Sequence, residues 1–266
     1  MLGLFVVAFA TAMSRNIRTE AIVLKTGRVG EIHKSVTLLT PDLGIIDAIA
    51  HGVYKGKGKL ASATDPFAWS ISYLYFEPVK KSYKITDMEC MDLFEGVRAD
   101  LRCYYAASLW AEVVIRSHGG GEGGDRVFGL MKEALGLLSS GADERCAQIQ
   151  FLWRFISISG FLPDTEACSI CGRNFDEREP VVYRRSEGDF ACESCMQESG
   201  LEGRSDRPLL GAGARRYLAY TEGLDFEEAV KIELVQRGKE QLLNLMYQFV
   251  QDILEVPLKT LQAGVL

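Results

Sequence analysis

The stretch TEAIVLKTGRVGEIHKSVTLLTPDLGIIDAIA, residues 19–50, decides the fold. It contains three short runs rich in β-branched and other apolar residues, a composition that favours extended strands. Glycines at positions 27 and 30 interrupt the first two runs as in a hairpin, and the turn sequence PDLG separates the second run from the third. The stretch therefore predicts three consecutive strands joined by short turns.

Two more strands are expected before the end of this region. The run WSISYLYFEP, residues 69–78, alternates large apolar side chains with small or polar ones, and YKITDMECMDLF follows at residues 83–94. A flat sheet of five short strands would leave its edges and one face uncovered. The sequence therefore predicts a small closed barrel, and the five-stranded OB-fold is the most economical choice.

After Phe94 the hydrophobic period changes from two toward 3.6, which indicates helices. Between residues 146 and 163 the only charged residue is Arg154, a composition typical of a central core helix. The predicted fold class is α+β, with an N-terminal OB-fold barrel at residues 17–95 and an α-helical domain at residues 96–266. The expected helices lie at residues 97–117, 126–138, 143–160 and 240–254.

The first 12 residues, MLGLFVVAFATA, are apolar and leave two interpretations open. Their Ala-Thr-Ala ending resembles a signal-peptidase site, which favours a secretory signal or anchor. However, no basic residue precedes the apolar run, the run is too short to cross a bilayer, and Met13 is a natural start. We expect residues 1–16 to form a disordered N-terminal extension of a soluble, cytoplasmic protein without a membrane partner.

Four of the seven cysteines form two CxxC pairs, Cys168 with Cys171 and Cys192 with Cys195. Two such pairs can present four thiolates in tetrahedral geometry, the ligand set that suits Zn2+. The intervening VVYRRSEGDFAC reads as a hairpin, so we expect a zinc-ribbon-like module at residues 165–198. Four thiolates close the coordination sphere, so one structural Zn2+ per chain is expected rather than a catalytic one.

Other interpretations of these cysteines are free thiols, a redox-active pair or an iron–sulfur cluster. The remaining three, Cys90, Cys103 and Cys146, are scattered along the chain. Because the total is odd and only one cluster is visible, the pattern favours a reducing compartment over a disulfide framework.

The formal net charge is -6, but residues 15–59 carry eight basic and four acidic side chains. This region includes HGVYKGKGKL, residues 51–60, which lacks the glycine spacing and the Ser or Thr of a nucleotide-binding P-loop. Its lysines can contact phosphates, its tyrosine can stack on a base, and its glycines allow close backbone approach. A solvated turn is the alternative. The expected DNA-binding residues are Arg15, Arg18, Arg28, Lys34, Tyr54, Lys55, Lys57 and Lys59.

No motif in the sequence indicates an enzyme or a small-molecule substrate. The run GGGEGG at residues 119–124 matches a dinucleotide-binding pattern literally, but a helix precedes it where a strand is required. The histidines His33, His51 and His118 do not cluster in the sequence with one another or with the cysteines. We interpret the glycine run as an interhelix loop, and we expect no catalytic residues.

The order and spacing of several segments resemble those of the RecO family of bacterial recombination mediators. EAIVLKTGRVGEIHKSVTLLTPDLGIIDAIAHG resembles the family's first three strands, and KGKGKLASATDPF stands where the family has a basic loop. FLWRFISISGFLPDTEACSICG, followed by CESC, resembles the core helix that runs into the zinc module, and LEVPLKTLQ resembles the C-terminal end. The family is usually richer in arginine where this chain has Val53 and Tyr54.

This resemblance implies a non-enzymatic, nucleoid-associated protein of DNA damage repair and recombination, in the RecFOR pathway. The OB-fold would bind single- and double-stranded DNA, the protein would anneal complementary strands, and with RecR it would load RecA onto SSB-coated DNA. The helical domain would bind the acidic, hydrophobic C-terminal tail of SSB, with Arg154, Arg215 and Arg216 as the expected contacts. Structural pairing of Arg154 is the alternative role for that residue.

Two other classes of function remain open from the sequence. One is a zinc-stabilised protein-interaction scaffold whose barrel binds RNA or peptide. The other is a metalloenzyme that uses the four-cysteine site, which a closed coordination sphere would exclude.

Overall fold

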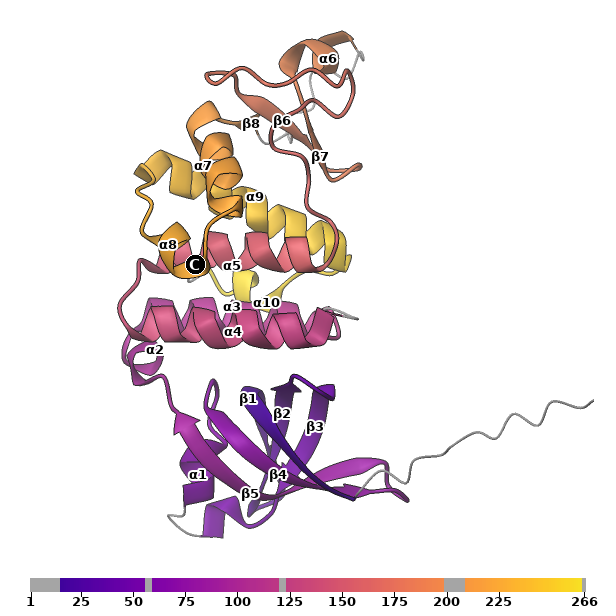
Figure 1. Cartoon of the computed structure of the whole chain (residues 1–266). Coiled ribbons are helices and arrows are strands. Elements are labelled where there is room, and N and C mark those ends of the chain that lie inside the picture. The colour runs from indigo at the N-terminus through magenta and orange to yellow at the C-terminus, as the bar shows by residue number, and fades with distance from the viewer. Residues whose placement is uncertain (1–14, 56–58, 120–122, 199–208, 265–266) are drawn as a thin grey trace, which may run out of the picture.

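The computed structural model describes residues 15–55, 59–119, 123–198 and 209–264. Figure 1 shows a barrel, a layered set of helices and a small β module stacked in that order along the molecule. The predicted extension at residues 1–16 lies outside the described residues except for its last two. Asn16 already begins the first strand, and the carbonyl of Arg15 accepts a hydrogen bond from the Phe76 N–H over 2.8 Å.

The N-terminal part is a closed five-stranded barrel with the strand order β1-β2-β3-β5-β4, which confirms the predicted OB-like fold. All neighbouring strands are antiparallel except β3 and β5, whose parallel pairing closes the barrel from Ala48 opposite Tyr83 to Ala50 opposite Ile85. The strands are β1 (Asn16–Val29), β2 (His33–Thr40), β3 (Gly44–Ala50), β4 (Trp69–Glu77) and β5 (Ser82–Asp92). A 3-10 turn, η1 (Val53–Lys55), and a short helix, α1 (Lys59–Ala63), connect β3 to β4.

The uninterrupted apolar run AIVL in β1 is explained by burial on both faces of the strand. Side chains alternate across a strand, so Ala21 and Val23 enter the barrel core. Ile22 and Leu24 point the other way and join the core of the helical domain. One face of the barrel is therefore covered by helices, and the strand needs no polar face there.

The helical domain is built around α5, whose core role was predicted from its composition. Ten of the fifteen residues of α5 are buried, and Phe151 stacks on Trp110 of α3 with ring centroids 4.5 Å apart. The helices are α2 (Glu95–Ala99), α3 (Leu101–Arg116), α4 (Gly124–Ser139), α5 (Glu144–Ile158), α7 (Ala212–Glu222), α8 (Phe226–Val230), α9 (Gln236–Leu254) and α10 (Lys259–Gln262). Among the described residues, no helix is long and apolar enough to cross a membrane.

A polar contact joins the barrel to α4 beside this shared core. The Glu20 carboxylate of β1 accepts a hydrogen bond from the Trp69 indole N–H over 2.9 Å and pairs with the Lys132 ammonium at 3.2 Å. The same ammonium lies 3.6 Å from the centre of the Trp69 ring, a cation–π contact. Residues of β1, β4 and α4 are thereby fixed relative to one another.

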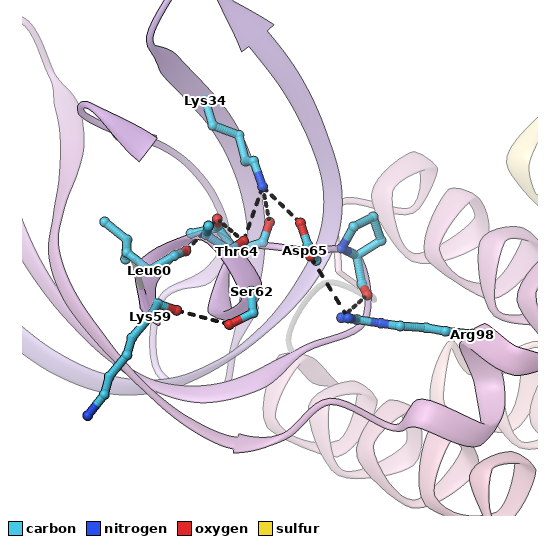
Figure 2. Close-up of polar contacts among 9 residues, drawn as sticks. Lys34, Lys59, Leu60, Ser62, Thr64, Asp65 and Arg98 are labelled. Carbon is cyan, nitrogen blue, oxygen red and sulfur yellow. Dashed lines mark hydrogen bonds and ion pairs between the residues drawn. The ribbon is translucent and has the colours of Figure 1, made fainter. Parts of the chain in front are cut away.

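The structure corrects the prediction for Lys34, which was expected to contact DNA. Lys34 is 5% exposed, and its ammonium group forms an ion pair with Asp65 at 2.9 Å. It also donates to the carbonyl groups of Ala61 and Thr64 at the end of α1 (Figure 2). A buried ammonium group is costly unless it is paired, and these acceptors satisfy it. Lys34 therefore stabilises the barrel and is not part of its accessible surface.

The same network extends from the barrel to the helical domain. The second carboxylate oxygen of Asp65 lies 4.0 Å from the Arg98 guanidinium group of α2, which also donates to the Pro66 carbonyl over 2.9 Å (Figure 2). The segment that follows α1 is consequently held by β2 on one side and by α2 on the other.

Replacing Lys34 with methionine tests this structural role. Lys34→Met keeps the length of the side chain but removes the ammonium group from Asp65 and from the carbonyls of Ala61 and Thr64. We expect the free energy of unfolding to fall by about 1–3 kcal/mol, measured by urea denaturation. Lys25→Met, at an exposed position of β1, is the matched control and should change stability little. Equal stability of the two variants would contradict the structural role.

Candidate nucleic-acid interface and metal centre

Tyr54 is held by its backbone and presents its ring to solvent. It lies in η1, and its N–H donates to the Ile32 carbonyl over 3.2 Å, while its side chain is 48% exposed. The guanidinium carbon of Arg28 lies 5.4 Å from the ring centre, and the buried Lys34 ammonium lies 5.7 Å from it. Arg28 itself donates to the Glu31 carbonyl over 3.0 Å. An exposed aromatic ring with a cation beside it suits both base stacking and phosphate contact.

Two similar pairs lie on neighbouring strands of the barrel. Arg18 of β1 is opposite Tyr73 of β4, with the guanidinium carbon 6.0 Å from the ring centre. Tyr75 of β4 is opposite Lys84 of β5, with the ammonium 5.8 Å from the ring. Sequence reasoning missed Tyr73, Tyr75 and Lys84 as site candidates. Their alternation was visible, but the cross-strand register that pairs them with cations was not.

The other predicted DNA-binding residues lie near the ends of the basic loop or at the start of β1. Arg15 and Lys55 are exposed, and Lys59 is the exposed first residue of α1. In Figure 2 the Lys59 side chain extends away from the contacts around Lys34. Lys57 lies outside the described residues. This side of the barrel therefore combines cations with partly exposed aromatic rings. We call it the barrel surface, and it consists of Arg15, Arg18, Arg28, Tyr54, Tyr73, Tyr75, Lys55, Lys59 and Lys84.

The four predicted cysteines come together at the far end of the molecule. Their sulfur atoms all lie within 4.8 Å of one another. Cys168 and Cys171 lie in a turn, Cys192 follows β7 (Asp189–Ala191), and Cys195 lies in α6 (Glu193–Glu198). The predicted hairpin is present as β6 (Val181–Arg184) and β7, and β8 (Leu209–Leu210) adds a third strand.

The environment of the first cysteine favours its thiolate form. Burial disfavours the charged sulfur of Cys168, but N–H groups of Cys171, Cys192 and Ile170 outweigh it and lower the pKa of this thiol to about 6. The Cys192 N–H lies 3.3 Å from the Cys168 sulfur. Because metals bind thiolates, a set of four sulfurs with N–H donors aimed at one of them can hold a metal ion.

The structure also corrects the prediction for Arg215, which was expected to contact a partner. Arg215 is 4% exposed, and it donates to the carbonyls of Thr165 over 3.0 Å and Asp176 over 2.7 Å. Its guanidinium group lies 5.2 Å from the Phe175 ring. These bonds tie α7 to the cysteine module, so Arg215 has a structural role. The adjacent Arg216 is exposed, in a groove with Glu166, Glu177 and Glu233.

Arg154 lines a cavity of about 380 Å³ between α4, α5 and α7. Its guanidinium group donates to the Leu224 carbonyl over 2.6 Å, so the structural pairing considered as its alternative role is present. The Nε atoms of Arg154 and Trp153 are nevertheless buried without a hydrogen-bond partner in the described part of the chain. The cavity is lined by Arg126, Leu130, Glu133, Trp153, Arg154, Ile158, Leu162 and others. Both roles considered for Arg154 are thus compatible with its position.

Two family models match consecutive parts of the chain. The family model "Recombination protein O N terminal" matches residues 13–94, and "Recombination protein O C terminal" matches residues 98–262. The chain belongs to the RecO family. The residues between the two RecO matches fall in α2, where the barrel ends and the helical domain begins.

Curated relatives of the RecO family extend over most of the chain. The DNA repair protein RecO of Caldanaerobacter subterraneus subsp. tengcongensis is 26% identical over 248 residues, which cover 92% of this chain and 96% of the relative. The DNA repair protein RecO of Syntrophobacter fumaroxidans is 26% identical over 248 residues, covering 93% and 96%. That of Rubrobacter xylanophilus is 27% identical over 184 residues, covering 68% and 72%.

Metal analysis tests the cysteine cluster. We expect one metal ion per chain in the purified protein and its loss in Cys168→Ser. Chelation should expose the four cluster thiols to a thiol reagent. Cys103 and Cys146 should react slowly at neutral pH, because burial raises the pKa of each to about 11.

The measurements are elemental analysis and timed thiol counting before and after chelation. Cys90→Ser, an exposed cysteine outside the cluster, is the matched control and should keep the metal. A Cys168→Ser protein with the full metal content would show that the ion is held elsewhere.

Proposed function

We propose that this chain is a non-enzymatic DNA-binding mediator of recombination that acts in the cytoplasm, at the nucleoid. The observation that carries the proposal is the barrel surface, where Arg18, Arg28 and Lys84 each lie beside a partly exposed tyrosine ring. Cations neutralise phosphates independently of sequence, and aromatic rings accept any base. The membership of the chain in a family of DNA repair proteins supports nucleic acid as the ligand.

Strand annealing follows from the same surface. Two complementary strands repel each other through their phosphates, and a cationic surface that binds one strand lowers this repulsion for the second. The barrel would therefore bind single- and double-stranded DNA and promote pairing. Together with RecR, the protein would help to load RecA onto SSB-coated single strands. RNA binding by the barrel is the alternative that a competition experiment would reveal.

The metal that suits the cysteine cluster best is Zn2+. Four thiolates form a soft, tetrahedral ligand set that leaves no coordination position for water. The ion would therefore hold the module together without taking part in a reaction. The proposed absence of catalysis rests on this closed ligand set and on the lack of catalytic motifs in the sequence.

The cavity at Arg154 is the proposed binding site for the acidic, hydrophobic tail of SSB. Arg126 and Arg154 supply positive charge at its wall, while Leu130, Ile158 and Leu162 supply apolar surface. Glu133 is the opposing charge, but burial raises the pKa of its carboxyl group, with Arg154 acting against that shift. The groove at Arg216 is a poorer choice, because three glutamates line it.

The basic loop is tested by changing Lys55, Lys57 and Lys59 together to alanine. We expect weaker binding of a labelled oligothymidylate, measured by fluorescence anisotropy between 50 and 200 mM salt. Each lost phosphate contact should reduce the slope of log K against log salt by roughly 0.7, so the total change should approach about 2. Tyr54→Ala should weaken binding and leave the slope unchanged, because a ring releases no counterions.

A matched control removes three exposed charges from the helical domain, Arg102, Lys231 and Arg237. This variant should keep both the affinity and the slope of the original protein. If the loop variant also kept them, the loop would have no part in DNA binding. Preference for an oligouridylate competitor would favour the RNA alternative.

The proposed tail site is tested with Arg126→Glu. Arg126 lines the cavity and is exposed, so its replacement should not disturb the fold. We expect a synthetic SSB tail peptide to bind at least about tenfold more weakly. The attraction between the positive charge of Arg126 and the acidic peptide is replaced by repulsion between a glutamate and that peptide. Isothermal titration calorimetry gives the affinity.

Arg102→Glu, at an exposed position on the first turn of α3 outside this cavity, controls for the general change in charge. It should bind the peptide as the original protein does. Equal peptide affinity of Arg126→Glu and the original protein would place the tail site elsewhere.

A further inference from the structure

Two histidines of the barrel lie against each other beside Tyr54. His33 begins β2 and His51 follows β3, and their Nδ1 atoms are 3.2 Å apart. The ring centroids are separated by 4.7 Å and the rings are inclined at 82°. His33 is half-buried and His51 is exposed, so the pair is accessible to a ligand from solvent. The proposed DNA-binding role has not used either residue.

The hydrogen bonds of the pair determine where its hydrogens lie. The backbone N–H of Gly52 lies 3.1 Å from Nδ1 of His33, and a backbone N–H can only donate. Nδ1 of His33 must therefore be an unprotonated acceptor, and the neutral ring carries its hydrogen on Nε2. Nδ1 of His33 has a single lone pair, which the Gly52 N–H shares with an Nδ1–H of His51 in a three-centre hydrogen bond, so Nδ1 of His51 carries a hydrogen. Nε2 of His51 is then the ring nitrogen that can take up a proton without breaking these bonds.

The elements around the pair carry charged side chains of both signs. Burial, His33 and Lys84 together hold the pKa of His51 below its ordinary value. The charged acidic side chains nearby are engaged or exposed: Glu77 contacts Lys84 at 3.5 Å, and Glu31 lies in the β1–β2 turn. Charged groups on the surrounding elements include Arg28 of β1, Glu31, Lys34 of β2 with its partner Asp65, Asp47 of β3, Lys55 of η1, Glu77 of β4 and Lys84 of β5. The exposed cations Arg28 and Lys55 would attract an anion to this side of the barrel.

We infer that His33, His51 and Lys84 form a phosphate-binding subsite for the nucleic-acid backbone, which gains a positive charge when Nε2 of His51 is protonated. This inference rests on the proposed function and adds to it a dependence of binding on pH. A phosphodiester oxygen accepts a hydrogen bond from Nε2 only when that atom is protonated. Lys84 lies opposite Ile49 across the β3–β5 pair, two residues before His51, so its ammonium would supply a second, permanent contact, and His33 fixes the His51 ring in place.

The sign of the pH dependence follows from linkage. In the free protein the pKa of His51 is held below its ordinary value, chiefly by burial, which favours the neutral ring. A bound phosphate stabilises the imidazolium form and raises this pKa. Between the two pKa values, binding takes up a proton, so the affinity rises as the pH falls through that window and then levels off. One proton limits the effect to about tenfold in affinity per pH unit.

The test measures the affinity of the full-length protein for a labelled oligothymidylate at pH 6.0, 7.0 and 8.0 at constant ionic strength. The original protein should bind about three- to tenfold more tightly at pH 6.0 than at pH 8.0. His51→Gln should bind at all three pH values with the weaker affinity that the original protein shows at pH 8.0. His51→Lys, which carries a permanent charge, should bind tightly with little dependence on pH.

His118→Asn is the matched control, because His118 lies after α3 outside the barrel and is the third histidine of the chain. It should keep the pH dependence of the original protein. Calorimetry in two buffers of different ionisation enthalpy should give an uptake approaching one proton for the original protein and none for His51→Gln. Thermal melts verify that each variant is folded.

The outcomes separate this inference from the proposed function. DNA binding that is independent of pH, or a His51→Gln protein with the original pH dependence, would overturn the subsite while leaving the barrel as the DNA-binding domain. Failure of the original protein to bind DNA at any of these pH values would overturn both.

Discussion

The segment that connects β3 to β4 depends on the hydrogen bonds and the ion pair of the buried Lys34 ammonium group. A charge in this position must be satisfied by nearby acceptors, and the acceptors lie where α1 ends and just beyond it, including Asp65. The bond between Tyr54 and Ile32 anchors the beginning of the same connection. The described ends of the basic loop, Lys55 and Lys59, therefore adjoin segments that are bonded to β2 and its turn.

The covered face of β1 decides which part of the barrel is available to a ligand. Ile22 and Leu24 are committed to the helical domain, and the Glu20–Lys132 contact lies beside them. The cation–tyrosine pairs consequently lie on the part of the outer barrel surface that the helical domain does not cover. The net charge of -6 does not oppose this arrangement, because residues 1–95 carry 11 basic and 10 acidic side chains, whereas residues 96–266 carry 19 and 26.

Much of the fold could be predicted from local sequence patterns. The alternation and turn signals of residues 19–50 predicted three strands, and the composition around Arg154 predicted a core helix, both confirmed. The two CxxC pairs predicted the cysteine cluster, because the spacing of these cysteines is visible in a short stretch of sequence. Lys34 and Arg215 were wrongly assigned because burial of a long cationic side chain depends on distant carbonyl groups. The pairing of Tyr75 with Lys84 and the contact between His33 and His51 required the register of the closed barrel.

The parallel pairing of β3 with β5 has a consequence for how the chain is made. The barrel cannot close until the strand that begins at Ser82 has been synthesised, so its formation waits for contacts between distant residues. Once closed, it still presents Ile22, Leu24, Leu39 and Phe67 to water until the helices emerge to cover them. A nascent chain at the ribosome therefore carries an exposed apolar face for as long as residues 101–158 are being added. The order of the domains along the chain makes the barrel the half whose apolar face stays uncovered until the helical domain follows.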